Sequence, residues 1–275
     1  MEKLKELRDK TGAGMVDCKK ALEEAGGELE KAVEILRKKG IAKAAKRTDR
    51  ETSEGVVKVA TDEAGKHGYI LQINSETDFV ARNEKFQNFG NDILAIIKAE
   101  QPEDMDDLMK LTMADGHSVE ENINTLSGVI GEKLALSVFG VISTAGTVAA
   151  YSHMGGKIGV LVALNKPGVK SLATDIAMQI AAANPKYISP ADVPAEELAK
   201  EKEIYAEQLR KEGKPENIIE KIMEGKVNKY YEEVCLVKQE FIKDDSKKIQ
   251  DILGDAKVEK FIVYSLSSGS RVCGA

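Results

Sequence analysis

The residue types that most often carry chemistry are sparse in this chain. Its three histidines, His67, His117 and His153, fall in or beside predicted turns, and none belongs to an HExxH motif or to a Cys/His cluster of metal-binding spacing. No Gly-Lys pair completes a phosphate-binding P-loop, and no GxSxG motif forms a hydrolase nucleophile elbow. The sequence therefore predicts a protein that is not an enzyme, and neither a metal ion nor a cofactor is expected.

One stretch, residues 74–83 with the sequence NSETDFVARN, lies between a strand pattern and a helix pattern and fits neither. An apolar strand signal at Tyr69–Ile73 precedes it, and apolar residues at helical spacing from Phe86 to Ile97 follow it. Phe79 therefore follows Asp78 at a strand-to-helix turn, and such turns lie on the surface and often carry function. Two plainer interpretations stay open from the residues alone: Phe79 folds onto its own helix, and Asp78 caps that helix.

The charge distribution argues against a general nucleic-acid binder. The 275 residues carry a net charge of −6, but residues 1–50 hold 14 basic and 10 acidic residues, so this segment is +4 and the remainder is −10. A basic module offered to a partner and an ordinary solvated helical face both explain this asymmetry. Three scattered cysteines without CxxC spacing, no signal-peptide pattern and no long apolar run predict a soluble cytoplasmic protein that uses neither a membrane nor direct nucleic-acid contact.

Three short amphipathic helices are predicted within residues 1–40, with glycines at 12, 14, 26 and 27 between them and Gly40 at the end of the third. A bundle of this size is near the lower limit for independent folding, so we expect it to present one face to something else. The arrangement resembles a ubiquitin-associated-type bundle, a likeness of shape that fixes no ligand. Residues 41–54 are charged and poor in large apolar groups, and are interpreted as a partly helical linker.

An internal repeat organises the rest of the chain. Residues 65–74 match residues 156–165 at a constant offset of 91, which also relates Val57 to Val148. Each copy is predicted to form two strands and a helix that covers them, because two strands cannot bury an apolar face alone. The sequence thus predicts an α+β core of two duplicated subdomains with antiparallel sheets. The first subdomain is expected at residues 55–140, and the second at residues 141–193 and 236–275.

The two copies differ directly after their shared asparagine. The first continues with residues 75–80, SETDFV, whereas the second continues with residues 166–169, KPGV, an ordinary turn. Only one copy therefore has an unusual connection.

Further elements follow from the same patterns. A short helix at 108–113, a longer one ending near Gly131 and a strand at 134–142 are predicted between the copies. Residues 194–235 are predicted to form an antiparallel helical hairpin, a coiled coil that turns at residues 212–215. A short helix at 246–253 and a strand at 259–266 complete the chain. If that strand rejoins the second sheet, the hairpin is an insertion.

At Thr77–Val80 the sequence resembles the elongation factor Ts family. Residues 11–22, TGAGMVDCKKAL, are similar to the family's N-terminal signature, and residues 44–46 to its linker. Residues 158–162 resemble a strand of its second subdomain, and residues 213–215 fall where the family turns its coiled coil. The resemblance spans nearly the full chain. It implies a partner, elongation factor Tu, bound in its GDP and nucleotide-free forms, whose exchange of GDP for GTP the protein would promote.

The resemblance also implies roles for named residues. Asp78 and Phe79, within the motif Thr77-Asp78-Phe79-Val80, match a wedge that enters the partner's GTP-binding domain and disturbs its magnesium site. His153 matches a histidine that reaches toward the partner's phosphate loop, although the Met-Gly-Gly-Lys run after it departs from the commoner one. A turn histidine bonded to its own backbone is the plainer alternative.

Further partner contacts are implied at Ile130 and in the N-terminal module. Ile130 matches a contact position, but its spacing also fits a core residue. Met15, Val16 and Lys19 match residues that dock on another helix of the partner. Val16 stands where the family has methionine, and Met15 could equally fill the core. Other function classes stay open: a non-exchange adaptor or holdase scaffold, and a hydrolase or transferase whose polar site the motifs do not reveal.

Overall fold

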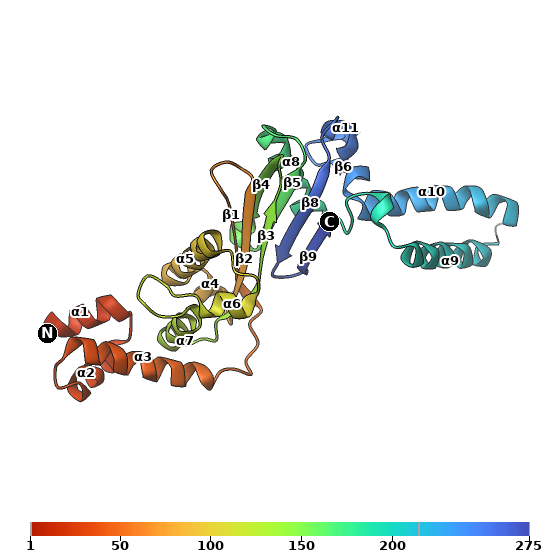
Figure 1. Cartoon of the computed structure of the whole chain (residues 1–275). Coiled ribbons are helices and arrows are strands. Elements are labelled where there is room, and N and C mark those ends of the chain that lie inside the picture. The colour runs from red at the N-terminus through yellow and green to blue at the C-terminus, as the bar shows by residue number, and fades with distance from the viewer. Residues whose placement is uncertain (1, 214, 275) are drawn as a thin grey trace.

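A computed structural model describes residues 2–213 and 215–274. It combines helices with antiparallel sheets, as the sequence predicts (Figure 1). A helical module at the N-terminus and a helical hairpin lie at opposite ends of an elongated molecule, with two sheets between them. Within the described part of the chain, none of the helices has the length and apolarity needed to cross a membrane.

The N-terminal module contains three helices whose apolar faces meet around Leu7, Cys18 and Leu36. The helices are α1 (Glu2–Thr11), α2 (Met15–Glu24) and α3 (Leu29–Ala45). The prediction that a helix stops at Gly40 is wrong, because α3 continues to Ala45. Gly40 is buried where α3 packs on α7 (Val119–Ile130), and a β-carbon on the facing Gly128 would lie 2.6 Å from the Gly40 carbonyl oxygen. Here glycine permits close helix packing instead of ending a helix.

The first sheet has the strand order β1-β2-β3, with all neighbours antiparallel. Its strands are β1 (Glu54–Thr61), β2 (His67–Ser75) and β3 (Ala135–Ser143). Helices α4 to α7 cover its outer face, where Phe86, Ile93 and Ile97 are buried. Besides α7, these helices are α4 (Asp78–Ala81), α5 (Glu84–Glu100) and α6 (Met105–Lys110). The predicted end of α7 near Gly131 is confirmed, because Gly131 follows it with φ 93°.

The second sheet has the antiparallel order β4-β5-β8-β9. Its strands are β4 (Thr147–His153), β5 (Ile158–Leu164), β8 (Val258–Ser265) and β9 (Gly269–Gly274). The predicted C-terminal strand, β8, does rejoin this sheet beside β5, so the hairpin is an insertion. The edge strand β9 was not predicted, because its Gly- and Ser-containing sequence lacks an apolar alternation. Helix α8 (Lys170–Ala183) covers the outer face.

The two sheets pack face to face, and glycines make the contact close. A shared cluster of Val57, Ile70, Val148 and Leu161, with residues of β3 and β8, fills the space between them. A β-carbon on Gly68 would lie 2.8 Å from Val148 Cγ1 and 3.0 Å from Leu161 Cδ2. Gly159, the repeat equivalent of Gly68, faces Val57 and Ile70, which are the repeat equivalents of Val148 and Leu161. The contact is therefore reciprocal between the repeats.

The hairpin consists of α9 (Ala195–Lys211) and α10 (Glu216–Val234). Lys214, in the predicted turn between them, lies outside the described residues. At the base of the hairpin, the Glu197 carboxylate accepts hydrogen bonds from the hydroxyls of Tyr187 (2.5 Å) and Tyr230 (2.6 Å). These contacts join the first helix of the hairpin to the second and to the segment after α8.

Two predicted helices are wrong in part. The helix predicted at 108–113 is α6, which begins earlier, at Met105, and ends at Lys110, so residues 111–113 lie outside it. Residues 246–248 belong to β7 (Asp244–Lys248), which pairs with β6 (Glu240–Phe241), and α11 begins only at Ile249 and ends at Leu253. The polar residues at 244–248 have no apolar face to bury as a helix, whereas Ile249 and Leu253 do. Short 3₁₀ turns, η1 (Met154–Gly156), η2 (Pro190–Asp192) and η3 (Leu236–Lys238), complete the chain.

We predict that Gly68→Ala destabilises the protein by about 1–3 kcal/mol, because the added methyl group overpacks the space between the sheets. Adding Val148→Ala should recover part of this loss, because it removes one of the methyl groups that Gly68 faces. Urea denaturation followed by circular dichroism measures both effects.

The control is Gly225→Ala in α10, where a β-carbon would meet no atom within 4 Å. This substitution should be neutral or slightly stabilising, because alanine favours a helix. Equal loss in both single variants would contradict the packing explanation.

Candidate functional site

Two side-chain caps shape the segment between β2 and α5. The Thr77 side chain accepts from the Val80 amide at the start of α4 (3.5 Å), and the Asn83 side chain accepts from the Lys85 amide at the start of α5 (2.9 Å). Each cap satisfies a helix amide that would otherwise lack an acceptor. Two helix starts within seven residues turn the chain sharply. The alternative that Asp78 caps the helix is wrong, since Thr77 does so.

Within the single turn of α4, the side chains divide between core and solvent. Val80 and Ala81 are buried in the cluster beneath α5, whereas Phe79 is 83% exposed. The alternative that Phe79 folds onto its own helix is therefore wrong. Leaving a phenylalanine in water forgoes roughly 1.5–3 kcal/mol of burial, so this position has no folding benefit. The buried neighbours hold the backbone that presents the ring.

The charged neighbours of Phe79 pair with each other. Arg82 Nη2 lies 2.8 Å from Asp78 Oδ2, one helical turn away, and both groups are in contact with solvent. An exposed pair of this kind contributes little to stability. Asp78 is therefore available to another molecule at small energetic cost.

A reciprocal pair of carboxylates ties α4 to the end of α7. Glu132 accepts from the Thr77 backbone amide (3.0 Å) and hydroxyl (2.6 Å), while Glu76 accepts from the Lys133 amide (2.6 Å). The Lys133 amide, followed by Arg50, lowers the pKa of Glu76. Sequence reasoning missed Glu132, because its partner lies 55 residues away and no spacing pattern reveals such a contact.

The predicted phosphate-side histidine lies at the end of β4. His153 Nδ1 is 3.1 Å from the Tyr151 hydroxyl, and the two rings stack with centroids 5.8 Å apart. The alternative of a histidine bonded to its own backbone is not what the structure shows, since the partner is a tyrosine side chain. Met154, which directly follows His153 in the turn η1, is 64% exposed.

The turn η1 and helix α4 lie at the same end of the two sheets. Gly156 packs on Val56, which belongs to the apolar cluster that also buries Val80 of α4. Lys157 pairs with Glu54 at the start of β1 (3.5 Å), and Glu54 is the strand partner of Ser75 at the end of β2. The structure thus brings Phe79 and His153 to one edge, although they lie 74 positions apart in the sequence.

Ile130, the last residue of α7, is half-buried and packs against the core beneath the first sheet. This placement agrees with the alternative that Ile130 is a core residue, as its helical spacing allows. Its side chain is not fully enclosed, and Glu132, which holds α4, follows two residues later.

The N-terminal candidates share one exposed face of α2. Met15 is 55% exposed and Val16 65%, so the alternative that Met15 fills the core is wrong. Lys19, one turn on, pairs with Glu23 in solvent (3.9 Å). Met15 also lines a hollow of about 480 Å³ with Leu4 and Arg8 of α1.

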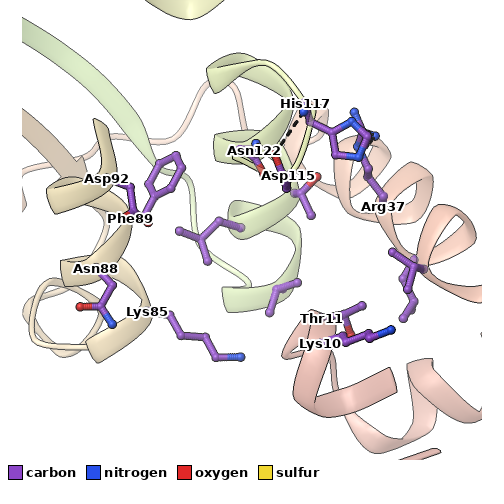
Figure 2. Close-up of a pocket in the computed structure, with 15 residues that line it drawn as sticks. Lys10, Thr11, Arg37, Lys85, Asn88, Phe89, Asp92, Asp115, His117 and Asn122 are labelled. Atoms are coloured by element: carbon purple, nitrogen blue, oxygen red, sulfur yellow. Dashed lines mark hydrogen bonds between the residues drawn. The ribbon is translucent and has the colours of Figure 1, made fainter. Parts of the chain in front are cut away.

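A cavity of about 550 Å³ lies between the N-terminal module and the helices of the first subdomain, beside the α3–α7 contact (Figure 2). Lys10 of α1, Lys85 of α5 and Arg37 of α3 face it, together with Asp92 and Asp115. Arg37 is already paired with Glu121 of α7 (2.5 Å) and contacts the His117 ring (2.6 Å). The lining therefore mixes charges of both signs and contains none of the predicted site residues. Across residues 2–213 and 215–274, no group of three or more His, Cys, Asp or Glu side chains is placed to hold a metal ion.

Comparison with known proteins identifies the family. The model of the family described as elongation factor TS matches residues 76–268, which is more than half of the chain. The chain belongs to the elongation factor Ts family. A curated elongation factor Ts from Chloroherpeton thalassium is 49% identical over 257 residues, which cover 91% of this chain and 89% of that protein. The family match begins at Glu76, one residue before the Thr77 cap, and includes the whole segment that presents Phe79.

Sequence reasoning missed the exposed Met154 beside His153. The one signal was in the resemblance, which marks the run after His153 as different from the commoner one. Its meaning depended on the backbone conformation of the turn, which composition does not reveal.

We predict that Glu132→Ala loosens α4, because the Thr77 amide and hydroxyl both lose their acceptor. A loss of about 1–3 kcal/mol is expected, with Glu132→Gln intermediate because an amide keeps one acceptor oxygen. Hydrogen exchange of residues 76–81 should rise in the alanine variant. Glu100→Ala, at an exposed position near the end of α5, is the control. Unchanged exchange in Glu132→Ala would exclude the positioning role.

We predict that acid weakens the same junction through Glu76. Its folded pKa lies below the ordinary value of 4.5, so the ionised carboxylate stabilises the fold above that pH. This contribution is lost as the pH falls through the folded pKa. The urea midpoint of Glu76→Gln should therefore depend less on pH between 6 and 3 than that of the wild type. The difference should correspond to the loss of about one titrating group. Glu63→Gln, in the exposed β1–β2 turn, should retain the wild-type dependence.

Proposed function

We propose that this protein binds elongation factor Tu, in its GDP-bound and nucleotide-free forms, and promotes the exchange of GDP for GTP. Membership of the elongation factor Ts family supports a role in translation elongation. The observation that carries the finer proposal is Phe79, which is 83% exposed on a helical turn. Buried neighbours, the Thr77 cap and the Glu132 carboxylate hold this turn in place. A large apolar ring held in solvent by a rigid backbone is suited to entering another protein.

Exchange follows from differential binding. A factor that binds the nucleotide-free partner more tightly than the GDP form weakens nucleotide binding by the same ratio. A factor with equal affinity for both forms would shift nothing. The ring of Phe79 can supply such a difference if its pocket is open only in the nucleotide-free partner.

The proposed division of labour follows the surfaces described above. Asp78 and Phe79 act on the magnesium side of the partner's nucleotide site, and His153 acts on the phosphate-loop side. Their placement at one edge supports action on a single nucleotide. Met15, Val16 and Lys19 anchor the complex through α2, and Ile130 contributes contact area at the end of α7.

The mechanism needs no covalent step. The pinned α4 requires no rearrangement before docking, so little binding energy is lost to ordering the wedge. An adaptor that binds without promoting exchange is the competing function. It would use the same exposed side chains, but would leave the rate of nucleotide release unchanged.

The deciding experiment follows the release of a fluorescent GDP analogue from elongation factor Tu in excess unlabelled nucleotide. Acceleration at a substoichiometric amount of this protein is expected, because the factor must leave after each exchange. Stable binding without acceleration would favour the adaptor.

We predict that Phe79→Ala folds normally but loses about 10- to 100-fold of the exchange stimulation. The range corresponds to the ~1.5–3 kcal/mol of ring burial in the complex. The free energy of unfolding should change by less than about 0.5 kcal/mol, since the ring contacts solvent. Ile242→Ala, which truncates an apolar side chain that is 48% exposed between β6 and β7, is the matched control. Full stimulation by folded Phe79→Ala would rule out the wedge.

A further inference from the structure

The turn after His153 has an unusual backbone. Met154, Gly155 and Gly156 have φ angles of 52°, 67° and 92°, so three consecutive residues lie in the left-handed region. Glycine adopts this region freely, whereas a side chain there meets its own carbonyl oxygen. Methionine is therefore the residue of the three that is strained.

The Met154 side chain gains little apolar burial that would offset this strain. It is 64% exposed and belongs to none of the apolar clusters that the described residues form. A glycine at this position would remove both the strain and the exposed apolar surface. Strain that the surroundings maintain is typical of functional sites.

The residues around the turn hold Met154 in this strained conformation. A β-carbon on Gly156 would lie 2.6 Å from Val56 Cγ2, so the turn is pressed against β1. Lys157, which follows the turn, pairs with Glu54 of β1 and accepts from the Leu266 amide (3.1 Å). These contacts attach the turn to both sheets, so its backbone is fixed where Met154 reaches the surface.

We propose that Met154 is a second apolar contact to the same partner that Phe79 enters. It lies next to His153, at the sheet edge that also carries α4. The partner surface that fits it is an apolar recess beside a nucleotide site. Methionine suits such a recess, because its unbranched thioether adapts to irregular surfaces. This inference rests on the proposed exchange function and adds a contact residue to it.

Three variants separate the side chain from the backbone. Met154→Ala removes the side chain and keeps the left-handed φ, Met154→Gly removes both, and Met154→Leu keeps an apolar side chain of similar size. Affinity for nucleotide-free elongation factor Tu, measured by titration calorimetry, should fall about tenfold in the first two, equivalent to about 1.4 kcal/mol. Met154→Leu should stay within about threefold of the wild type.

The matched control is Gln101→Gly. Gln101 caps α5 with φ 48°, so glycine relieves the same kind of strain on the first subdomain without touching η1. Its affinity for the partner should equal that of the wild type, and the thermal midpoint of Met154→Gly should not fall.

The outcomes are distinguishable. If the wild type binds and stimulates exchange while Met154→Ala and Met154→Gly bind as tightly as it does, the Met154 contact is refuted and the proposed function stands. If the wild type neither binds nor stimulates exchange, the proposed function itself fails. A tenfold loss in Met154→Gly but not in Met154→Ala would assign the effect to the backbone and also refute the side-chain contact.

Discussion

The close approach of β2 and β5 across the interface between the sheets is the contact on which the other features depend. Gly68 and Gly159 face the apolar side chains of the opposite repeat, and any β-carbon there would push the sheets apart. Because the contact is reciprocal, the two sheets have little freedom to shift relative to each other. This fixes where the strands end. The connection after β2 and the turn after β4 consequently meet at one edge, where neither repeat alone could have placed them.

Duplication explains how one stable core supports unequal loops. The strands and covering helices of both repeats bury apolar side chains in the same way, so the connections between them were free to differ. The first repeat has a segment with two helix caps and an exposed phenylalanine, whereas the second has an ordinary turn at the corresponding place. The second repeat instead presents a histidine and a strained methionine at the end of β4. Each exposed apolar residue forgoes burial, and the stability of the shared core makes this tolerable.

Contacts of two carboxylates and two glycines connect helices α3, α4 and α7 at this edge of the sheets. Glu132 and Glu76 connect α4 to the residues after α7, and the Gly40–Gly128 contact connects α7 to α3. The exposed face of α2 is therefore linked through packed elements to the exposed ring of Phe79. Such preorganisation lowers the entropy lost when a partner binds several surfaces at once.

The sequence by itself determined the local elements and the duplication. Apolar periodicity located α5 and α7, the offset repeat revealed two matching sheets, and the Thr77–Val80 motif indicated the connection that presents Phe79. Tertiary structure alone decided the rest. Gly40 was expected to end a helix and instead lies inside α3, because what matters there is the distance to α7. Glu132 carries no local signal, since it acts through a contact 55 residues away, and the role of Met154 depends on a backbone conformation that its neighbours impose. Local patterns report which face of an element is apolar, whereas long-range contacts depend on how distant elements pack, and no short stretch of sequence encodes that.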